Sequence, residues 1–148
     1  MTDHSERGFT LIELAITIVV MGIVLGFSIP AFQSLSASFQ LRGAAEDVAG
    51  QLRLAREKAI ATGVEQPMHI PATLTSGAYR TYHIHYPSGI STQWLLPNGI
   101  AFTSASVNGW YHMQTDGRCA ESGLIVLTDR RGSRDTVSVQ LSGLVLTR

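Results

Sequence analysis

The chain has 148 residues, with eleven basic and eleven acidic side chains and a formal net charge of zero. This length fits one domain plus an anchor segment, and the neutral balance provides no strong field to attract nucleic acid or an acidic partner. The single cysteine, Cys119, excludes an intramolecular disulfide and a zinc site built from several cysteines.

The first element is an apolar run near the N-terminus. From Leu14 to Phe27 the only polar side chain is Thr17, and no charge follows until Arg42. The run reaches roughly the ~20 residues that a membrane-spanning helix needs. Glu13 lies just inside its start, and an ionised carboxylate costs about 2.5–3.5 kcal/mol at the bilayer centre. No cation lies within helical reach inside the run, so Glu13 is a functional candidate that needs a partner from elsewhere.

A free amine created by proteolysis is the expected partner of Glu13. Cutting the bond between Gly8 and Phe9 gives Phe9 an α-amino group, and an axially displaced neighbouring copy can place that amine beside the carboxylate. The sequence Gly8-Phe9-Thr10-Leu11-Ile12-Glu13 before an apolar helix resembles the type III signal sequence of type IV pilins and type II secretion pseudopilins. The resemblance implies cleavage after Gly8 by a prepilin peptidase, N-methylation of Phe9 and subunit docking guided by Glu13.

Two other interpretations of this segment remain open. One is an ordinary single-pass membrane anchor in which Glu13 has no special role. The other is a secretory signal peptide cleaved after the small residues of Leu35-Ser36-Ala37, which predicts a mature N-terminus near Ser38. The signal-peptide interpretation requires a longer apolar core than usual and a carboxylate where basic residues belong. We therefore favour the pilin-type interpretation.

The helix is expected to continue beyond the apolar run. Pro30 cannot donate a hydrogen bond to the carbonyl of Gly26, so we expect a bend or local melting there. Past it, apolar residues recur at steps of four and three, which places them on one helical face. They are Leu41, Ala45, Val48, Leu52, Ala55 and Ala59. Thr62-Gly63 supplies a C-terminal stop, so the pattern predicts one helix from about Phe9 to Thr62.

Charged residues occupy the other side of the second half of this helix. Arg42 with Glu46, and Arg53 with Glu57, are opposite charges four residues apart and are expected to pair. The apolar stripe needs a globular body to cover it. The predicted organisation is a leader peptide at 1–8, a transmembrane and assembly helix at 9–32, an amphipathic half of the helix at 33–63 and a β-rich domain at 64–148.

The β-rich domain is predicted from alternation and turn signals. Tyr82, Ile84 and Tyr86 fall on one face of a strand, and His83 and His85 fall on the other. The expected strands are 64–70, 79–86, 94–96, 100–102, 110–111, 124–127, 136–141 and 144–147. Turns are expected at Pro87–Gly89, Asn98–Gly99, Asp129–Ser133 and Ser142–Gly143, and flexible loops at Pro71–Gly77 and Thr103–Gly109.

Three further segments resemble the H-type minor pseudopilins, the GspH/FimT group. Leu54–Ile60 resembles the alanine–arginine helix end of that group, Leu127–Gly132 its strand-to-glycine turn and Val137–Val145 its closing strand pair. The resemblance implies a pilin-like α+β fold, in which a long N-terminal helix, transmembrane and then amphipathic, packs on a C-terminal antiparallel β-sheet or sandwich. The middle of the chain, from about Pro67 to Cys119, carries no matching motif.

Histidines are the candidate metal ligands. His83 and His85 project the same way from one predicted strand, and His69 and His112 are the candidates to join them. No cysteine or acid lies nearby at ligand spacing, so a polar strand face that points to solvent is favoured and no metal is expected. Cys119 is expected to be an unreactive thiol in a loop. No nucleophile elbow or carboxylate pair supports hydrolysis, so the chain is expected not to be an enzyme.

A cluster of arginines is the candidate nucleic-acid contact, because guanidinium groups at a hairpin tip can bind phosphates. The arginines of this candidate contact are Arg130, Arg131, Arg134 and Arg148. The FimT-like minor pilins that the chain resembles include DNA-uptake receptors. Asp129 and Asp135 offset part of this charge, and Gly143 is followed by apolar residues where the DNA-binding relatives tend to carry arginines. A solvated turn or a contact between subunits is therefore favoured.

The resemblance implies a non-enzymatic structural subunit of a type II secretion pseudopilus, without a cofactor. It implies an inner-membrane anchor, a C-terminal domain in the periplasm, and three kinds of partner: other pseudopilins, a prepilin peptidase and the inner-membrane assembly platform. The expected assembly residues are Leu11, Ile12, Glu13, Leu14, Ile16, Ile18, Val19 and Pro30. The second expectation is a FimT-like minor pilin of a type IV pilus, for adhesion, twitching or DNA uptake.

Overall fold

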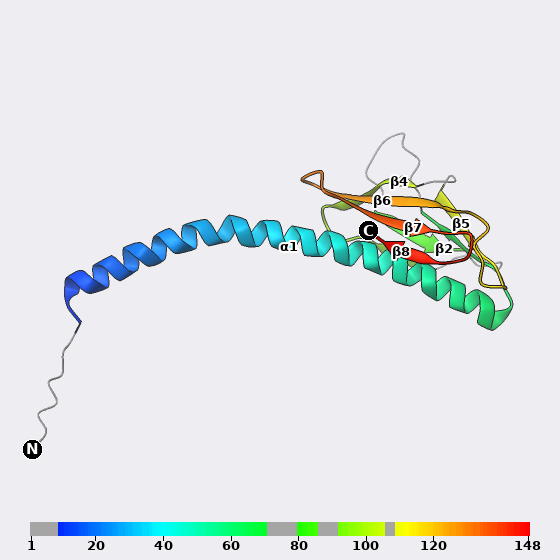
Figure 1. Cartoon of the computed structure of the whole chain (residues 1–148), viewed down its shortest axis with the longest axis horizontal. Coiled ribbons are helices and arrows are strands. Elements are labelled where there is room, and N and C mark those ends of the chain that lie inside the picture. The colour runs from blue at the N-terminus through cyan, green and yellow to red at the C-terminus, as the bar shows by residue number, and fades with distance from the viewer. Residues whose placement is uncertain (1–8, 71–79, 86–91, 106–108) are drawn as a thin grey trace, which may run out of the picture. The chain divides into compact units, whose positions relative to one another are not determined.

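The computed structural model describes residues 9–70, 80–85, 92–105 and 109–148, apart from the side chains at positions 30 and 31. The described residues form one helix followed by eight strands (Figure 1). These elements are α1 (Leu11–Thr62), β1 (Gln66–His69), β2 (Thr81–Ile84), β3 (Gln93–Leu95), β4 (Ile100–Ala105), β5 (Trp110–Met113), β6 (Gly123–Asp129), β7 (Arg134–Val139) and β8 (Val145–Thr147).

Helix α1 has capped ends. At its start the hydroxyl of Thr10 accepts a hydrogen bond from the backbone N–H of Glu13 at 3.3 Å, as an N-cap residue does. At its end Gly63 takes a φ of 65°, and its N–H donates to the carbonyl of Ala59 at 3.0 Å. The predicted single helix is confirmed. Its backbone is helical at Pro30, so the local melting expected there is not found.

The chain divides into two compact units, Met1–Ser36 and Ala37–Arg148. In the first unit, every described apolar side chain of the helix from Leu11 to Ile29 is exposed. The second unit contains the rest of α1 and all eight strands, and it has its own hydrophobic core. The two units therefore differ in what their apolar side chains contact.

The strands form two four-stranded sheets in which all neighbours are antiparallel. We call them sheet A, with the order β3-β2-β1-β5, and sheet B, with the order β4-β6-β7-β8. In sheet A, His69 lies opposite His83 on β2 and opposite Trp110 on β5. In sheet B, the β6–β7 pair is joined by the tight turn expected at Asp129–Ser133. The strand order therefore places β1 between β2 and β5.

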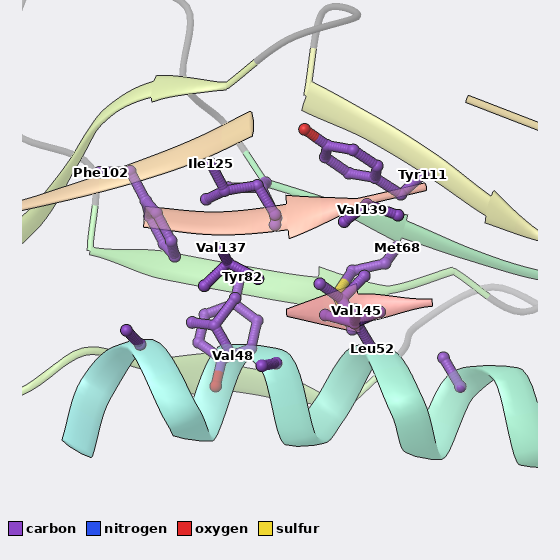
Figure 2. Packing of buried hydrophobic residues seen from close by; sticks show 14 of the residues in the cluster. Val48, Leu52, Met68, Tyr82, Phe102, Tyr111, Ile125, Val137, Val139 and Val145 are labelled. Atoms are coloured by element: carbon purple, nitrogen blue, oxygen red, sulfur yellow. The ribbon is translucent and has the colours of Figure 1, made fainter. Parts of the chain in front are cut away.

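One cluster of buried residues joins the second half of α1 to both sheets. Val48 and Leu52 point from the helix toward the strands (Figure 2). Met68 from sheet A and Val145 from sheet B belong to the same buried cluster. The apolar stripe predicted on the helix is confirmed, because all six of its residues are at most 5% exposed. Ala44 and Ala49 widen the stripe, and these small side chains occupy little space between the helix backbone and the strands.

Two side chains of the helix hold β8. Arg53 donates to the carbonyl of Val145 at 3.0 Å, and Glu46 accepts a hydrogen bond from the hydroxyl of Thr147. Arg53 and Glu46 also approach one another, at 3.8 Å. The expected pairing of Glu46 with Arg42 is therefore wrong, because Glu46 faces β8 and Arg53. Residues 46 and 53 are two helical turns apart and lie on the same side of the helix.

The strand prediction was too short at β4. Thr103, Ser104 and Ala105 were expected in a flexible loop, but they continue the strand beyond a bulge between Phe102 and Ser104. β4 is an edge strand of sheet B, where polar residues are common because one side of the strand faces solvent. The rest of that predicted loop, apart from Gly109, and the segments Pro71–Gly77 and Pro87–Gly89 lie outside the described residues.

Candidate assembly surface and other candidate sites

The first half of α1 presents an apolar surface on all its sides. The expected packing residues are all exposed, and Leu11 is 88% exposed. Leu11–Thr62 is the one described helix long and apolar enough to cross a membrane, with a window of mean hydropathy 2.4 and none of that window buried. An apolar surface that continues around a helix is suited to lipid or to other apolar helices. The exposed residues that were expected to pack between helices are Leu11, Ile12, Leu14, Ile16, Ile18 and Val19.

Glu13 occupies the first turn of this helix. Thr10 is the N-cap, so Glu13 is the third helical residue and the two form the T-x-x-E pattern of a capping box. An acid in the first turn also interacts favourably with the positive end of the helix dipole. The cap was missed in the sequence, although the Thr10-x-x-Glu13 spacing is its ordinary signal.

The predicted cleavage point lies just before the helix. Gly8 is outside the described residues, whereas Phe9 is described and 80% exposed. Only Phe9 and Thr10 separate the predicted cleavage point from the first helical residue, Leu11. Cleavage there would put a cationic amine close to the positive end of the helix dipole, which is unfavourable without an acid nearby.

The helix end and the closing hairpin meet at a junction. Arg56 donates through Nε to the carbonyl of Gly117 at 2.7 Å. Gly143 has a φ of +78°, and a Cβ placed on it would lie 2.0 Å from the Gly117 oxygen and 2.8 Å from Nε of Arg56. Two of the segments that carry the resemblance, the alanine–arginine helix end and the Ser142–Gly143 turn, therefore lie against each other. Sequence reasoning identified both segments but not their contact.

Three of the four candidate histidines come together. His83 and His85 project to the same side, as predicted, and their Nε2 atoms are 2.8 Å apart. The ring of His69 on the neighbouring strand lies 5.1 Å from that of His83. All three rings are half-buried, so the expected fully solvated strand face is only partly correct. His112 is engaged elsewhere, since its Nδ1 lies 2.6 Å from a carboxylate oxygen of Glu121.

The candidate DNA-contact arginines are all exposed and lie toward one end of sheet B. Arg130 and Arg131 are in the β6–β7 turn, and Arg134 begins β7. Arg148 exchanges backbone hydrogen bonds with Thr136, two residues along β7 from Arg134. The structure therefore groups the four arginines that the sequence singled out.

The acid beside this cluster shapes the turn. The carboxylate of Asp129 accepts hydrogen bonds from the backbone N–H groups of Arg131 at 2.9 Å and Ser133 at 2.8 Å. An aspartate that binds its own backbone in this way stabilises a tight turn. The structure therefore gives Asp129 a local structural role.

Cys119 is a buried thiol. It is 2% exposed, and burial is the largest of the effects that raise its pKa. Because the thiolate is the nucleophilic form, a raised pKa lowers reactivity at neutral pH. The structure therefore supports the expected unreactive thiol.

Comparison with known sequences identifies the N-terminal segment. A family model described as the prokaryotic N-terminal methylation motif matches residues 3–29. The fimbrial protein of Pseudomonas aeruginosa is 39% identical over 61 residues, 41% of this chain and 39% of that protein. The type IV major fimbrial protein FimA of Dichelobacter nodosus is 37% identical over 60 residues, 40% of this chain and 38% of that protein. The chain thus matches these relatives over about two fifths of their length.

Comparison with solved structures identifies the fold. The minor pseudopilin EpsH of the Vibrio cholerae type 2 secretion system is similar with a TM-score of 0.57 and 14% identity, over 74% of this chain and 96% of that one. The type IV minor pilin FimU of Pseudomonas aeruginosa is similar with a TM-score of 0.59 and 12% identity, over 77% of this chain and 92% of that one.

A methylation motif at the N-terminus and a pilin-like fold therefore occur together in this chain. Its first residues carry the prepilin-type methylation motif, and its long helix with antiparallel sheets is the predicted pilin-like α+β architecture. The fold is similar to those of the minor pseudopilin EpsH and the minor pilin FimU.

Proposed function

We propose that the chain is a structural minor pseudopilin of a type II secretion system. It is cleaved after Gly8, methylated on Phe9 and held in the bacterial inner membrane by Phe9–Phe32, with its C-terminal domain in the periplasm. The observation that carries this proposal is the exposure of the apolar side chains of its first helical half beside an acid in the first turn. Such a surface requires lipid before assembly and neighbouring helices afterwards.

Glu13 is the residue that directs assembly in this proposal. The mature amine on Phe9 and the carboxylate of Glu13 are both costly in an apolar environment. A neighbouring subunit shifted along the helix axis places its amine against Glu13, so each subunit neutralises the charge of the next. Pro30 and the exposed residues from Leu11 to Val19 complete the contact between helices. A prepilin peptidase and the inner-membrane assembly platform are the other proposed partners.

Replacing Glu13 tests the proposal. Glu13→Ala is expected to leave cleavage and N-methylation intact, as mass spectrometry of the mature chain would show, and to remove most of the protein from sheared fibres. Glu57→Ala is the matched control, because it deletes an exposed acid from the second half of the same helix. Equal incorporation of both variants would contradict the charge-pair mechanism. Gly8→Ala is expected to leave uncut precursor in the membrane, and a mature N-terminus near Ser38 would contradict the leader assignment.

A minor pilin of a type IV pilus is the second candidate. It is supported by the TM-score of 0.59 with FimU and by the N-terminal identity with two fimbrial proteins. The residues proposed for assembly are the same in both cases. Deleting the gene in the source bacterium separates them, because loss of exoprotein secretion supports the pseudopilin and loss of twitching or DNA uptake supports the pilin.

DNA binding by the arginine cluster is a separable part of the second candidate. The grouping of Arg130, Arg131, Arg134 and Arg148 supports it, whereas the adjacent Asp129 and Asp135 oppose it. We expect no salt-dependent shift of labelled duplex DNA by the purified protein. A shift that disappeared after combined Arg130→Ala, Arg131→Ala and Arg134→Ala changes would instead establish a phosphate-binding surface.

A further inference from the structure

The register of sheet A brings three imidazole rings to one place. His69 on β1 lies directly opposite His83 on β2. His85 follows β2 on the same side as His83, and its backbone N–H donates to the carbonyl of Pro67 at 2.8 Å, which holds it against β1. The ring centroids are 5.1 Å apart for His69–His83, 4.6 Å for His83–His85 and 6.3 Å for His69–His85. Each of the three rings therefore has both others as neighbours.

The nitrogen atoms of these rings converge. One ligand nitrogen from each histidine lies within 4.8 Å of the other two, and the Nε2 atoms of His83 and His85 are 2.8 Å apart. Three imidazole nitrogens bound to one Zn²⁺ at about 2.0–2.1 Å in tetrahedral geometry are about 3.3 Å apart. The Nε2 separation of His83 and His85 is about 0.5 Å shorter than this value, so a small side-chain adjustment would bring these two nitrogens to the spacing of metal ligands.

The pKa is lowered for two of the three histidines, His69 and His83. Burial, followed by the proximity of His83 and His85, lowers the pKa of His69. Burial, followed by the proximity of His85, lowers the pKa of His83.

Trp110 holds the cluster in place from β5. Its ring stacks on that of His69, with centroids 4.2 Å apart and planes at 24°, and it lies 4.9 Å from the ring of His85. Aromatic stacking of this kind limits the rotation of a side chain and preorganises a ligand set. The ring of Trp110 also stacks with that of His112, with centroids 5.9 Å apart, and His112 is held by Glu121. The carboxylate of Glu121 therefore supports a different histidine.

We propose that His69, His83 and His85, three ligands that the described residues bring together, form a binding site for one divalent transition-metal ion. Three imidazoles suit Zn²⁺, Cu²⁺ and Ni²⁺, whereas Ca²⁺ and Mg²⁺ prefer oxygen ligands. From the sequence, the strand face that carries His83 and His85 was expected to be polar only. In the proposed site this face supplies two metal ligands, and β1 supplies the third, His69. The inference is independent of whether the subunit belongs to a secretion system or to a pilus.

Metal titration of the mature full chain in detergent tests the site. The protein is purified without a histidine tag and stripped with a chelator, then titrated with Zn²⁺ against a chromophoric chelator and with Co²⁺ by visible absorption. We expect one ion per chain and no competition from Ca²⁺. The variants His69→Gln, His83→Gln and His85→Gln are each expected to lose at least about 10- to 100-fold in affinity, because outer-shell changes alone have effects of that size.

His112→Gln is the matched control, since it removes a histidine from the same sheet but outside the cluster, and it is expected to keep the affinity. Far-UV circular dichroism in the absence of metal checks that each variant is folded. A second measurement uses the unmodified chain: Zn²⁺ should shift the side-chain ¹⁵N resonances of His69, His83 and His85 but not those of His112. Absence of stoichiometric binding, or binding lost only in His112→Gln, would overturn the proposal.

Discussion

The two halves of α1 are both α-helical, but their apolar side chains have opposite surroundings. In the first half every described apolar side chain up to Ile29 is exposed, whereas in the second half a stripe of leucine, valine and alanine is buried against two sheets. The difference is present in the sequence, because the first half is apolar on all sides and the second has charged residues between its apolar positions. A continuous apolar surface is typical of helices in lipid or in helical assemblies, and a stripe is typical of one wall of a domain.

The acids on the two halves differ in the same way. Glu13 stands alone at the start of the apolar half, with no cation in the run that follows. Glu46 in the second half contacts Arg53 and the hydroxyl of Thr147. An acid that has partners within its own domain stabilises that domain locally, whereas we propose that Glu13 acts through a neighbouring molecule.

The largest expected effect comes from truncating the same residue type in the two halves. Leu52→Ala removes a fully buried side chain and should lower the free energy of unfolding of the C-terminal unit by about 2–5 kcal/mol. Leu25→Ala, at an exposed position of the first half, should change it little. Denaturant unfolding followed by the fluorescence of Trp94 and Trp110 measures both. Equal losses would show that the two halves do not differ as described.

The next effect concerns the junction that fixes the second half to the closing hairpin. Gly132→Ala introduces a side chain at φ +84° with nothing within 4 Å, and should cost about 1–2 kcal/mol. Gly143→Ala has a similar φ but meets the Gly117 carbonyl. It should cost about 1–2 kcal/mol more, because that carbonyl must move away from Arg56. Thermal unfolding of the two variants isolates the contact. No difference between them would mean that the junction does not stabilise the unit.

The smallest expected effect on the free energy of unfolding appears only at alkaline pH. Burial, followed by the proximity of Asp47 on the second half of α1, raises the pKa of Tyr82 to about 12. In the unfolded chain a tyrosine ionises near pH 10. The unfolded state is therefore favoured increasingly as the pH rises from about 10 to 12, by up to about 2–3 kcal/mol. Tyr82→Phe should lose less stability than the unmodified protein between pH 9 and about 11. Parallel pH profiles would contradict the assignment.

Periodicity made the helix and most strands predictable. The six residues of the stripe follow from helical spacing alone, and the alternation of Tyr82 and Ile84 with His83 and His85 gave the correct faces of β2. The N-terminal methylation motif was also recognisable, because it is short and contiguous. Each of these features depends on residues close together in the chain.

Contacts between distant segments were not predictable. His69 meets His83 only because β1 and β2 pair in one particular register, and no local pattern fixes that register across the segment that joins them. The contact of Arg56 with Gly117 beside Gly143 likewise depends on the placement of separate elements. The extension of β4 to Ala105 was missed because its polar residues suit an edge strand as well as a loop.

The attachment of β8 to the helix has a consequence for biosynthesis. Translation delivers the whole of α1 before any described strand, and β8 emerges from the ribosome after the other seven. The hydrogen bond from Arg53 to Val145 therefore cannot form until β8, the last of the described strands, has been synthesised. Until then the apolar stripe of the helix lacks the last described strand that covers it. The growing chain therefore exposes apolar surface while aggregation and chaperone binding compete with folding.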